Sequence, residues 1–202
     1  MNSVKNRVNT LLFVTTNTGK FQEVQRWLAQ WMPDIQLEQA ALDIPEYQSL
    51  DVYEVARGKA LHAWQCLQKP LLIDDGGIYL ERYTNFPGTL SKYVYQSIGF
   101  EGIWRLACDD PRAYFLSCLV YITSPDNYQF FDGICKGTLI NPIGVQVTHK
   151  QLPFTDIFVP SGTTQVFSAL KNTAQEEQCH HRAAALKKFV LWFKEFSNQD
   201  AP

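Results

Sequence analysis

Short apolar runs alternate with longer amphipathic segments through the first third of the chain. Residues 10–15 form an apolar, β-branched run typical of a buried strand, and residues 35–41 predict a second strand. After each of them, in residues 21–31 and 51–68, apolar residues recur at helical spacing, and Pro33 ends the first of these segments. This order of strand, helix, strand and helix predicts the opening of an α/β fold.

The middle of the chain predicts further strands. Residues 70–73 form a third apolar run, which we expect to end in the polar turn Asp74-Asp75-Gly76-Gly77. Three more runs follow one another at residues 113–122, 128–134 and 137–140. We expect a turn near Lys136 between the last two, and an antiparallel addition to the sheet from all three.

The last periodic segment, residues 181–196, predicts an amphipathic C-terminal helix. Neither an internal repeat nor a Pro-rich or Ser-rich linker divides the chain, so we expect residues 1–202 to form a single domain. The strands that end at Thr15 and Asp74 would bring polar groups to one place. The predicted fold is therefore α/β, with an elongated mixed β-sheet flanked by helices and two lobes around a central cleft.

Composition narrows the possible functions. With 202 residues, 46% of them hydrophobic, the chain can bury a sizeable core. The formal net charge is only -2 and both signs are mixed along the chain, so we expect no nucleic-acid partner. The apolar run at residues 11–14 is too short for a signal peptide or a membrane span, which predicts a cytoplasmic protein with no membrane partner. Five cysteines without a C-x-x-C pair predict buried, reduced thiols.

Residues 15–20, Thr-Thr-Asn-Thr-Gly-Lys, combine a strand end, a hydroxyl-rich turn and the start of a helix. Backbone amides and the macrodipole at a helix N-terminus favour anions, so this segment is a candidate phosphate site. It does not have the G-x-x-x-x-G-K-[ST] pattern of the P-loop, and the same local structure is common in proteins that bind no phosphate.

Acidic residues follow the second and third predicted strands. Glu46 and the pair Asp74-Asp75 would together make a set of hard oxygen ligands suited to Mg²⁺, which holds substrate phosphates through a few carboxylates and waters. Taken singly, Glu46 can also be interpreted as an exposed loop acid, and the local sequence of Asp74-Asp75 favours a polar turn. Lys59 and Arg182 could likewise be surface charges or halves of weak ion pairs.

Taken in order, these elements resemble the inosine triphosphate pyrophosphatase family, whose members hydrolyse noncanonical purine nucleoside triphosphates to monophosphate and pyrophosphate. Seven ordered landmarks over nearly the whole chain carry the resemblance. They are Thr15–Lys20, Asp43–Gln48, Lys59-Ala60, Ile73–Gly76, Asn85–Gly88, Gly133 with Gly137, and His181-Arg182. The resemblance implies Mg²⁺ as the cofactor, a nucleoside triphosphate as the substrate and a homodimer as the assembly.

The resemblance also implies which residues handle phosphate. Thr15, Asn17 and Lys20 would bind the triphosphate, while Lys59 and Arg182 would offset its charge. Lys20 and Lys59 would count as catalytic, because negative charge develops on the phosphate oxygens when the α-phosphorus is attacked.

For the metal, the resemblance implies Glu46 and Asp74 as ligands, with Asp75 beside them. Asp75 would also orient or deprotonate the attacking water, so no covalent nucleophile is needed. The family usually has Glu-Asp at this place, which makes Asp74 one methylene shorter than expected and would shift the ion slightly.

The base-recognition segment departs from the family pattern. In the segment Gln151–Phe158 the usual glycine-aromatic-Asp-Pro sequence is replaced by residues 152–156, which leaves Phe154 as a candidate for stacking on the base and Thr155 at the position of the expected Asp. Glu176 replaces a family Lys, and His180-His181-Arg182 replaces Ser-His-Arg; we expect these residues to contact the substrate. A glutamate that faces the base would disfavour a 6-oxo group, so one hypothesis is a specificity for a 6-amino or modified base. In the alternative interpretation, Glu176 points to solvent.

Two other functions stay open at this point. The chain could be a nucleotide-binding module without turnover, or a related phosphohydrolase that acts on a pyrimidine or modified nucleotide. Metal-dependent release of pyrophosphate would separate the first from an enzyme, and a panel of substrates would separate the second.

Overall fold

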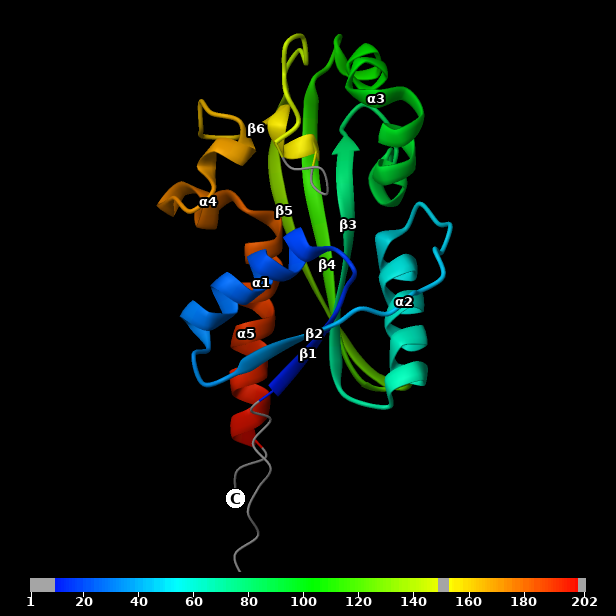
Figure 1. Cartoon of the computed structure of the whole chain (residues 1–202), viewed down its shortest axis with the longest axis vertical. Helices are drawn as coiled ribbons and strands as arrows, with labels where there is room; N and C mark the ends of the chain where they lie inside the picture. The colour runs from blue at the N-terminus through cyan, green and yellow to red at the C-terminus, as the bar shows by residue number, and fades with distance from the viewer. Residues whose placement is uncertain (1–9, 149–152, 200–202) are drawn as a thin grey trace, which may run out of the picture.

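The computed structural model describes residues 10–148 and 153–199, which build one mixed sheet of six strands (Figure 1). The strands are β1 (Thr10–Val14), β2 (Gln36–Ala40), β3 (Leu71–Leu80), β4 (Arg112–Ser124), β5 (Asn127–Leu139) and β6 (Phe158–Pro160), in the spatial order β2-β1-β3-β4-β5-β6. β1 is parallel to β2 and β3, whereas β3, β4, β5 and β6 pair antiparallel. The predicted α/β class and the antiparallel addition are confirmed.

Helices cover both faces of this sheet. The α-helices within the described residues are α1 (Thr18–Trp31), α2 (Val52–Leu67), α3 (Ser91–Ala107), α4 (Ala174–Cys179) and α5 (His181–Gln199). Short 3-10 turns are η1 (Gly88–Leu90), η2 (Pro153–Asp156) and η3 (Phe167–Leu170). In Figure 1, α2 and α3 lie on one side of the long strands, and α1, α4 and α5 lie on the other. None of the helices in the described residues is long and apolar enough to cross a lipid bilayer.

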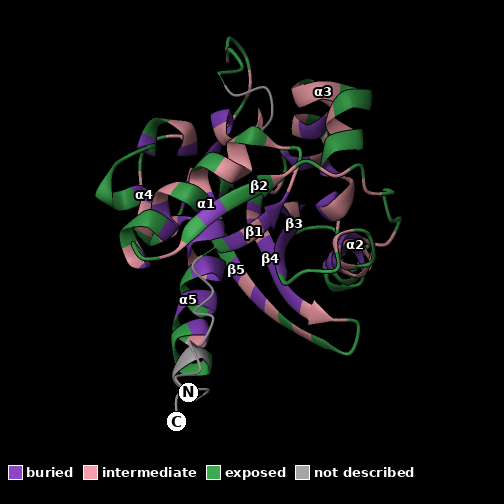
Figure 2. Ribbon diagram, turned by 60° about the horizontal axis from the view of Figure 1, so that its bottom comes forward, coloured by how far each residue is buried: buried purple, intermediate pink, exposed green. Residues whose placement is uncertain are grey.

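The core forms where the periodic apolar faces of α5 and α2 pack on the two faces of the sheet. α5 buries Leu186 and Phe189 against one face of the sheet, and α2 buries Ala56 and Ala60 against the other. The middle strands are therefore buried on both faces, as their colouring in Figure 2 shows. This packing explains why β4 is an almost continuous apolar run instead of an alternation of apolar and polar residues.

Some predicted elements were wrong in extent. β3 does not end before the acidic pair but continues through it to Leu80, because every residue from Leu71 to Leu80 pairs with β4. β5 is unbroken across Lys136, which pairs with Tyr114, so the expected turn is absent. The cysteines are all free as expected, although Cys66 and Cys108 are exposed instead of buried.

Candidate active site

The candidate site lies where β1 stops and β3 continues. Ile73 is the last β3 residue that pairs with β1, and Asp74 and Asp75 follow it directly. At the same level the chain leaves β1 and turns into α1. The prediction that Thr15 and the acidic pair converge at one end of the sheet is therefore supported by the register of β1 against β3.

The turn into α1 is shaped by its own polar side chains. The hydroxyl of Thr15 accepts a hydrogen bond from the backbone amide of Asn17 at 3.1 Å. The side-chain oxygen of Asn17 in turn accepts from the amide of Lys20 at 3.0 Å and caps the helix. Thr15 and Asn17 thus fix the turn that leads from β1 into α1.

Asp74 is the centre of a buried ionic cluster on the α1 side of the sheet. Its side chain is fully buried, and its Oδ2 lies 2.9 Å from Nζ of Lys20 and 3.1 Å from Nε of Arg182. The hydroxyl of Ser117 donates to the other carboxylate oxygen. Burial raises the pKa of Asp74, but the charges of Arg182 and Lys20 outweigh it and bring the pKa down to about 2. Asp74 is accordingly a permanent anion that positions two cations.

Arg182 is held from a second direction by Glu23 on α1. Its Nη1 pairs with Glu23, whose other oxygen lies 3.4 Å from Nε2 of His180. Burial raises the pKa of Glu23, yet Arg182 and His180 lower it to about 2. Two carboxylates therefore balance the charges of Lys20 and Arg182, which makes a buried arginine possible.

Asp75 faces the other side of β3, because successive side chains on a strand point to opposite faces. Its Oδ2 lies 2.6 Å from Nζ of Lys59, which is also 3.0 Å from Oε2 of Glu46. Burial lowers the pKa of Lys59, but Asp75 and Glu46 outweigh this and raise it. The charged lysine therefore bridges two carboxylates that come from different elements.

The residues present fit Mg²⁺ in part. Glu46 and Asp75 both pair with Lys59, and Glu46 is half-exposed beside a cavity of about 540 Å³. Asp74, the third predicted ligand, has its oxygens on Lys20, Arg182 and Ser117. Within the described residues, no three His, Cys, Asp or Glu side chains form a complete metal site. An incomplete protein shell suits Mg²⁺, which keeps waters and binds substrate phosphates.

A second cavity, of about 450 Å³, opens on the α1 side and has the size of a small-molecule site. Thr18 and Gly19, at the N-terminus of α1, line it. Phe167 and His180 also line it, and their rings lie 4.8 Å apart. This cavity, which we call the α1 cavity, therefore has a helix N-terminus suited to phosphate and an aromatic wall suited to a base.

The predicted base contacts are only partly brought together. Thr155 lines the α1 cavity. Phe154 instead packs its ring on Tyr95 and Phe100 and is 7% exposed, so it belongs to the core and not to the cavity wall. Gln151 and Leu152, at the start of the divergent segment, lie outside the described residues.

Glu176 lines the α1 cavity but is neither an unpaired acceptor nor directed to solvent. It is 5% exposed; its Oε1 accepts from Nη2 of Arg26 at 2.8 Å, and its Oε2 accepts from the amide of Asn172 at 2.7 Å. The interpretation that Glu176 points to solvent is therefore wrong, whereas its predicted contact with the base stays a prediction.

His181 is buried beside the cavity wall. Its ring stacks on Phe115 and on His180, with ring centroids 4.8 and 4.6 Å apart. Burial, with the charges of His180 and Arg182, lowers its pKa well below the usual value. Its Nδ1 has no hydrogen-bond partner among the described residues. A neutral ring in this position fits an aromatic support for His180.

The sequence and fold of the chain are similar to those of known proteins. Residues 11–192 match the family model described as the Ham1 family. The chain belongs to the Ham1 family. The dITP/XTP pyrophosphatase of Methanopyrus kandleri is 33% identical to it over 91% of this chain and 96% of its own length, and that of Pyrococcus horikoshii is 32% identical over the same shares.

Solved structures support the same fold for this Ham1-family chain. The Ham1 protein of Staphylococcus aureus superposes with a TM-score of 0.72 at 18% identity, covering 92% of this chain and 98% of its own. A HAM1 protein from Coxiella burnetii gives a TM-score of 0.70 at 19% identity with the same coverage. The expected resemblance to the inosine triphosphate pyrophosphatase type is thereby confirmed at the level of family and fold.

Three residues of the site in this Ham1-family chain were not predicted. Glu23 and Arg26 follow Lys20 at intervals of three, so helical periodicity places them on its face of α1 and could have identified them. Ser117 pairs across the strands with Gly76. Its approach to Asp74 depends on the register of β4 against β3, which no local pattern in the sequence gives.

Proposed function

We propose that this Ham1-family chain is a Mg²⁺-dependent nucleoside triphosphate pyrophosphatase that hydrolyses a noncanonical purine nucleotide to its monophosphate and pyrophosphate. The observation that carries the proposal is the pair of adjacent carboxylates, Asp74 and Asp75, which face opposite sides of β3 and each hold a lysine. Relatives that are about one-third identical over nine-tenths of the chain are dITP/XTP pyrophosphatases, which supports an enzyme of this class.

The triphosphate would lie at the N-terminus of α1. Backbone amides of the first helical turn and the helix dipole favour anions there, and the partly exposed Lys20 can donate to a phosphate oxygen. Arg182 is fixed by Asp74 and Glu23, so it would add positive charge without having to reorganise during the reaction.

Asp75 would orient the attacking water and accept its proton, with Lys59 fixing the position of the carboxylate. Glu46 and Asp75 would hold Mg²⁺ from the protein side. When bound, the ion would offset charge on the phosphate oxygens and on the leaving pyrophosphate. The homodimer, the cytoplasmic location and the absence of a nucleic-acid partner stay predictions from the sequence.

The test is release of pyrophosphate from a panel of inosine, xanthosine, adenosine, guanosine and pyrimidine triphosphates, with and without Mg²⁺. We expect Mg²⁺-dependent release from at least one 6-oxopurine nucleotide. Asp75→Asn should lower kcat by at least about a hundredfold, since general-base catalysis contributes that much. Asp132→Asn is the matched control, because Asp132 pairs with Lys188 on the surface of β5.

If the folded wild-type protein released no pyrophosphate from any nucleotide of the panel, the proposal would be contradicted and a binding module without turnover would be favoured. Release that survives Asp75→Asn unchanged would remove Asp75 from the chemistry.

A further inference from the structure

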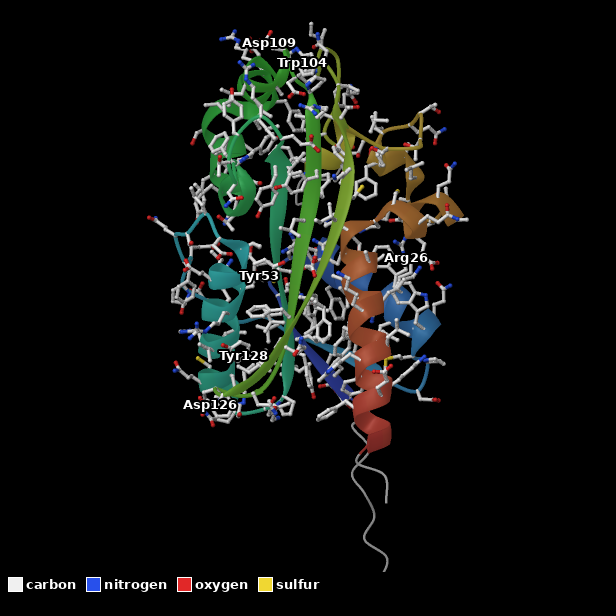
Figure 3. The ribbon with its side chains drawn as sticks, turned by 180° about the vertical axis from the view of Figure 1, so that it is seen from behind. Arg26, Tyr53, Trp104, Asp109, Asp126 and Tyr128 are labelled. Carbon is white, nitrogen blue, oxygen red and sulfur yellow. The ribbon has the colours of Figure 1, made fainter. Side chains whose placement is uncertain are left out.

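Arg26 lies on the wall of the α1 cavity, seven residues beyond Gly19 along the helix. Gly19, Gln22, Glu23 and Arg26 all line this cavity, as their spacing of three and four residues requires. Seven residues of α-helix span about 10 Å. Figure 3 shows Arg26 beside the upper part of α5, at the junction with α4. Arg26 therefore lies about two helical turns from the N-terminus of α1. Its guanidinium is 4.9 Å from the ring of Trp27, which lies 4.5 Å from the ring of His180 on the cavity wall.

The guanidinium of Arg26 is held in place by groups from the far end of the chain. Its Nη2 donates to Glu176 at 2.8 Å, its Nη1 donates to the side-chain oxygen of Asn172, and it lies 4.9 Å from the ring of Trp27. Glu176 is itself fixed by the amide of Asn172. Buried Glu176 thus orients the partly exposed Arg26, and in this arrangement the arginine, not the glutamate, would contact the ligand.

An arginine carries five N–H donors and no acceptor. Two of these donors are used by Asn172 and Glu176, so donors remain for a ligand in the cavity. A 6-oxopurine presents an acceptor at position 6, whereas adenine presents an amino donor there. An arginine facing that position pairs with the first and leaves donor against donor with the second.

We propose that Arg26, oriented by Glu176, is the residue that selects a 6-oxopurine over a 6-aminopurine in the α1 cavity. The inference rests on the proposed function, since it assumes that a purine nucleotide is the substrate. It predicts the opposite of a 6-amino specificity. The family lysine that Glu176 replaces is a hydrogen-bond donor, and Arg26 on α1 would supply a donor in its place. Guanine also has a 6-oxo group, so Arg26 cannot separate guanosine from inosine nucleotides.

The experiment compares kcat/KM for inosine and adenosine triphosphates in the wild type, Arg26→Gln, Arg26→Lys and Lys171→Gln. The wild type should prefer the inosine nucleotide, and Arg26→Gln should reduce the preference by about 10- to 100-fold, as expected for loss of a charge-assisted hydrogen bond. Arg26→Lys keeps a cationic donor and should retain part of the preference. Lys171 is an exposed cation that lines the same cavity, so its variant tests the rival donor.

A second readout needs no turnover. Calorimetric titration with inosine and adenosine monophosphates should show the same loss of preference in Arg26→Gln, while the thermal midpoint reports any purely structural effect of breaking the pair with Glu176. A wild type that prefers adenine nucleotides would overturn the inference, as would a preference unchanged in Arg26→Gln or lost only in Lys171→Gln. If no triphosphate is hydrolysed but the monophosphate preference depends on Arg26, the proposed function fails and the inference stands.

Discussion

Neighbouring carboxylates on one strand have different electrostatic environments in this molecule. Asp74 is fully buried in contact with two cations and a hydroxyl, whereas Asp75 shares Lys59 with the half-exposed Glu46. Bringing a divalent ion to a pair of carboxylates costs less where one of them is solvated, because less charge has to be rearranged in a buried site. The geometry therefore favours Glu46 and Asp75 over Asp74 as the protein ligands of Mg²⁺.

A pair of matched variants tests this assignment. Glu46→Gln should raise the Mg²⁺ concentration for half-maximal pyrophosphate release by about tenfold or more, because it removes a charged ligand. Asp74→Asn should leave that concentration near the wild-type value. It should instead lower the free energy of unfolding by about 3–5 kcal/mol, since buried cations lose their partner. Mg²⁺ titrations and urea unfolding of both variants measure the two effects, and the reverse pattern would make Asp74 the ligand.

Sequence identified most charged residues of the site but not their partners. Lys20 and Arg182 were expected around the phosphates and Asp74 at the metal, and the structure brings all three into one cluster. The role of Glu176 could not be inferred because its partner, Arg26, is 150 residues away in the chain. Phe154 looked like a stacking residue because sequence does not reveal that other rings enclose it.

Among the elements, α5 depends on a close approach to β5 at Gly133. A Cβ there would lie 2.0 Å from the carbonyl oxygen of His181 and 2.5 Å from the amide nitrogen of Ala185. Both are backbone atoms, so neither can rotate away. Gly133→Ala should displace the first turn of α5, with Arg182, and lower the free energy of unfolding by about 1–3 kcal/mol or more. Urea unfolding and pyrophosphate release together measure this.

The same substitution at Gly58 is the control. There the nearest atoms to an added Cβ belong to the ring of Tyr47, which is 40% exposed and can move. Gly58 lies within α2, where alanine is favoured over glycine by up to about 1 kcal/mol. Gly58→Ala should keep or raise stability. Equal losses in the two variants would show that the contact between α5 and β5 is not what requires Gly133.

Most helices and strands were predicted from their apolar patterns, but the extents of β3 and β5, which depend on pairing with β4, were not. α2 and α5 have apolar stripes, so their existence follows from the sequence. The extent of β3 beyond Ile73 does not, because polar and glycine residues continue a strand only when a neighbour such as β4 pairs with them. α3 was missed because few of its residues are buried and Gly99 interrupts it with a positive φ of 60°.

At the scale of the whole molecule, ion pairs join the first helix to the last part of the chain. Glu23 and Arg26 on α1 hold Arg182 at the start of α5 and Glu176 on α4. These pairs line or adjoin the α1 cavity, between elements that lie on the same side of the sheet in Figures 1 and 3. A nucleotide in this cavity would contact α1 and α4 at once, and so would bind only the folded state.

Ligand binding should therefore stabilise the whole molecule by mass action. With Mg²⁺ and a nonhydrolysable inosine triphosphate analogue at about 100 times its dissociation constant, the free energy of unfolding should rise by about 2.7 kcal/mol. For a chain of this length, Tm should rise by roughly 5–10 °C. Scanning calorimetry at several analogue concentrations measures the shift, with inosine, which lacks phosphates, as the weaker control. A Tm independent of analogue concentration would contradict binding.

Because the ligand would bridge both ends of the chain, the melting transition should move as one peak, and a split peak would place the ligand on one part of the molecule alone.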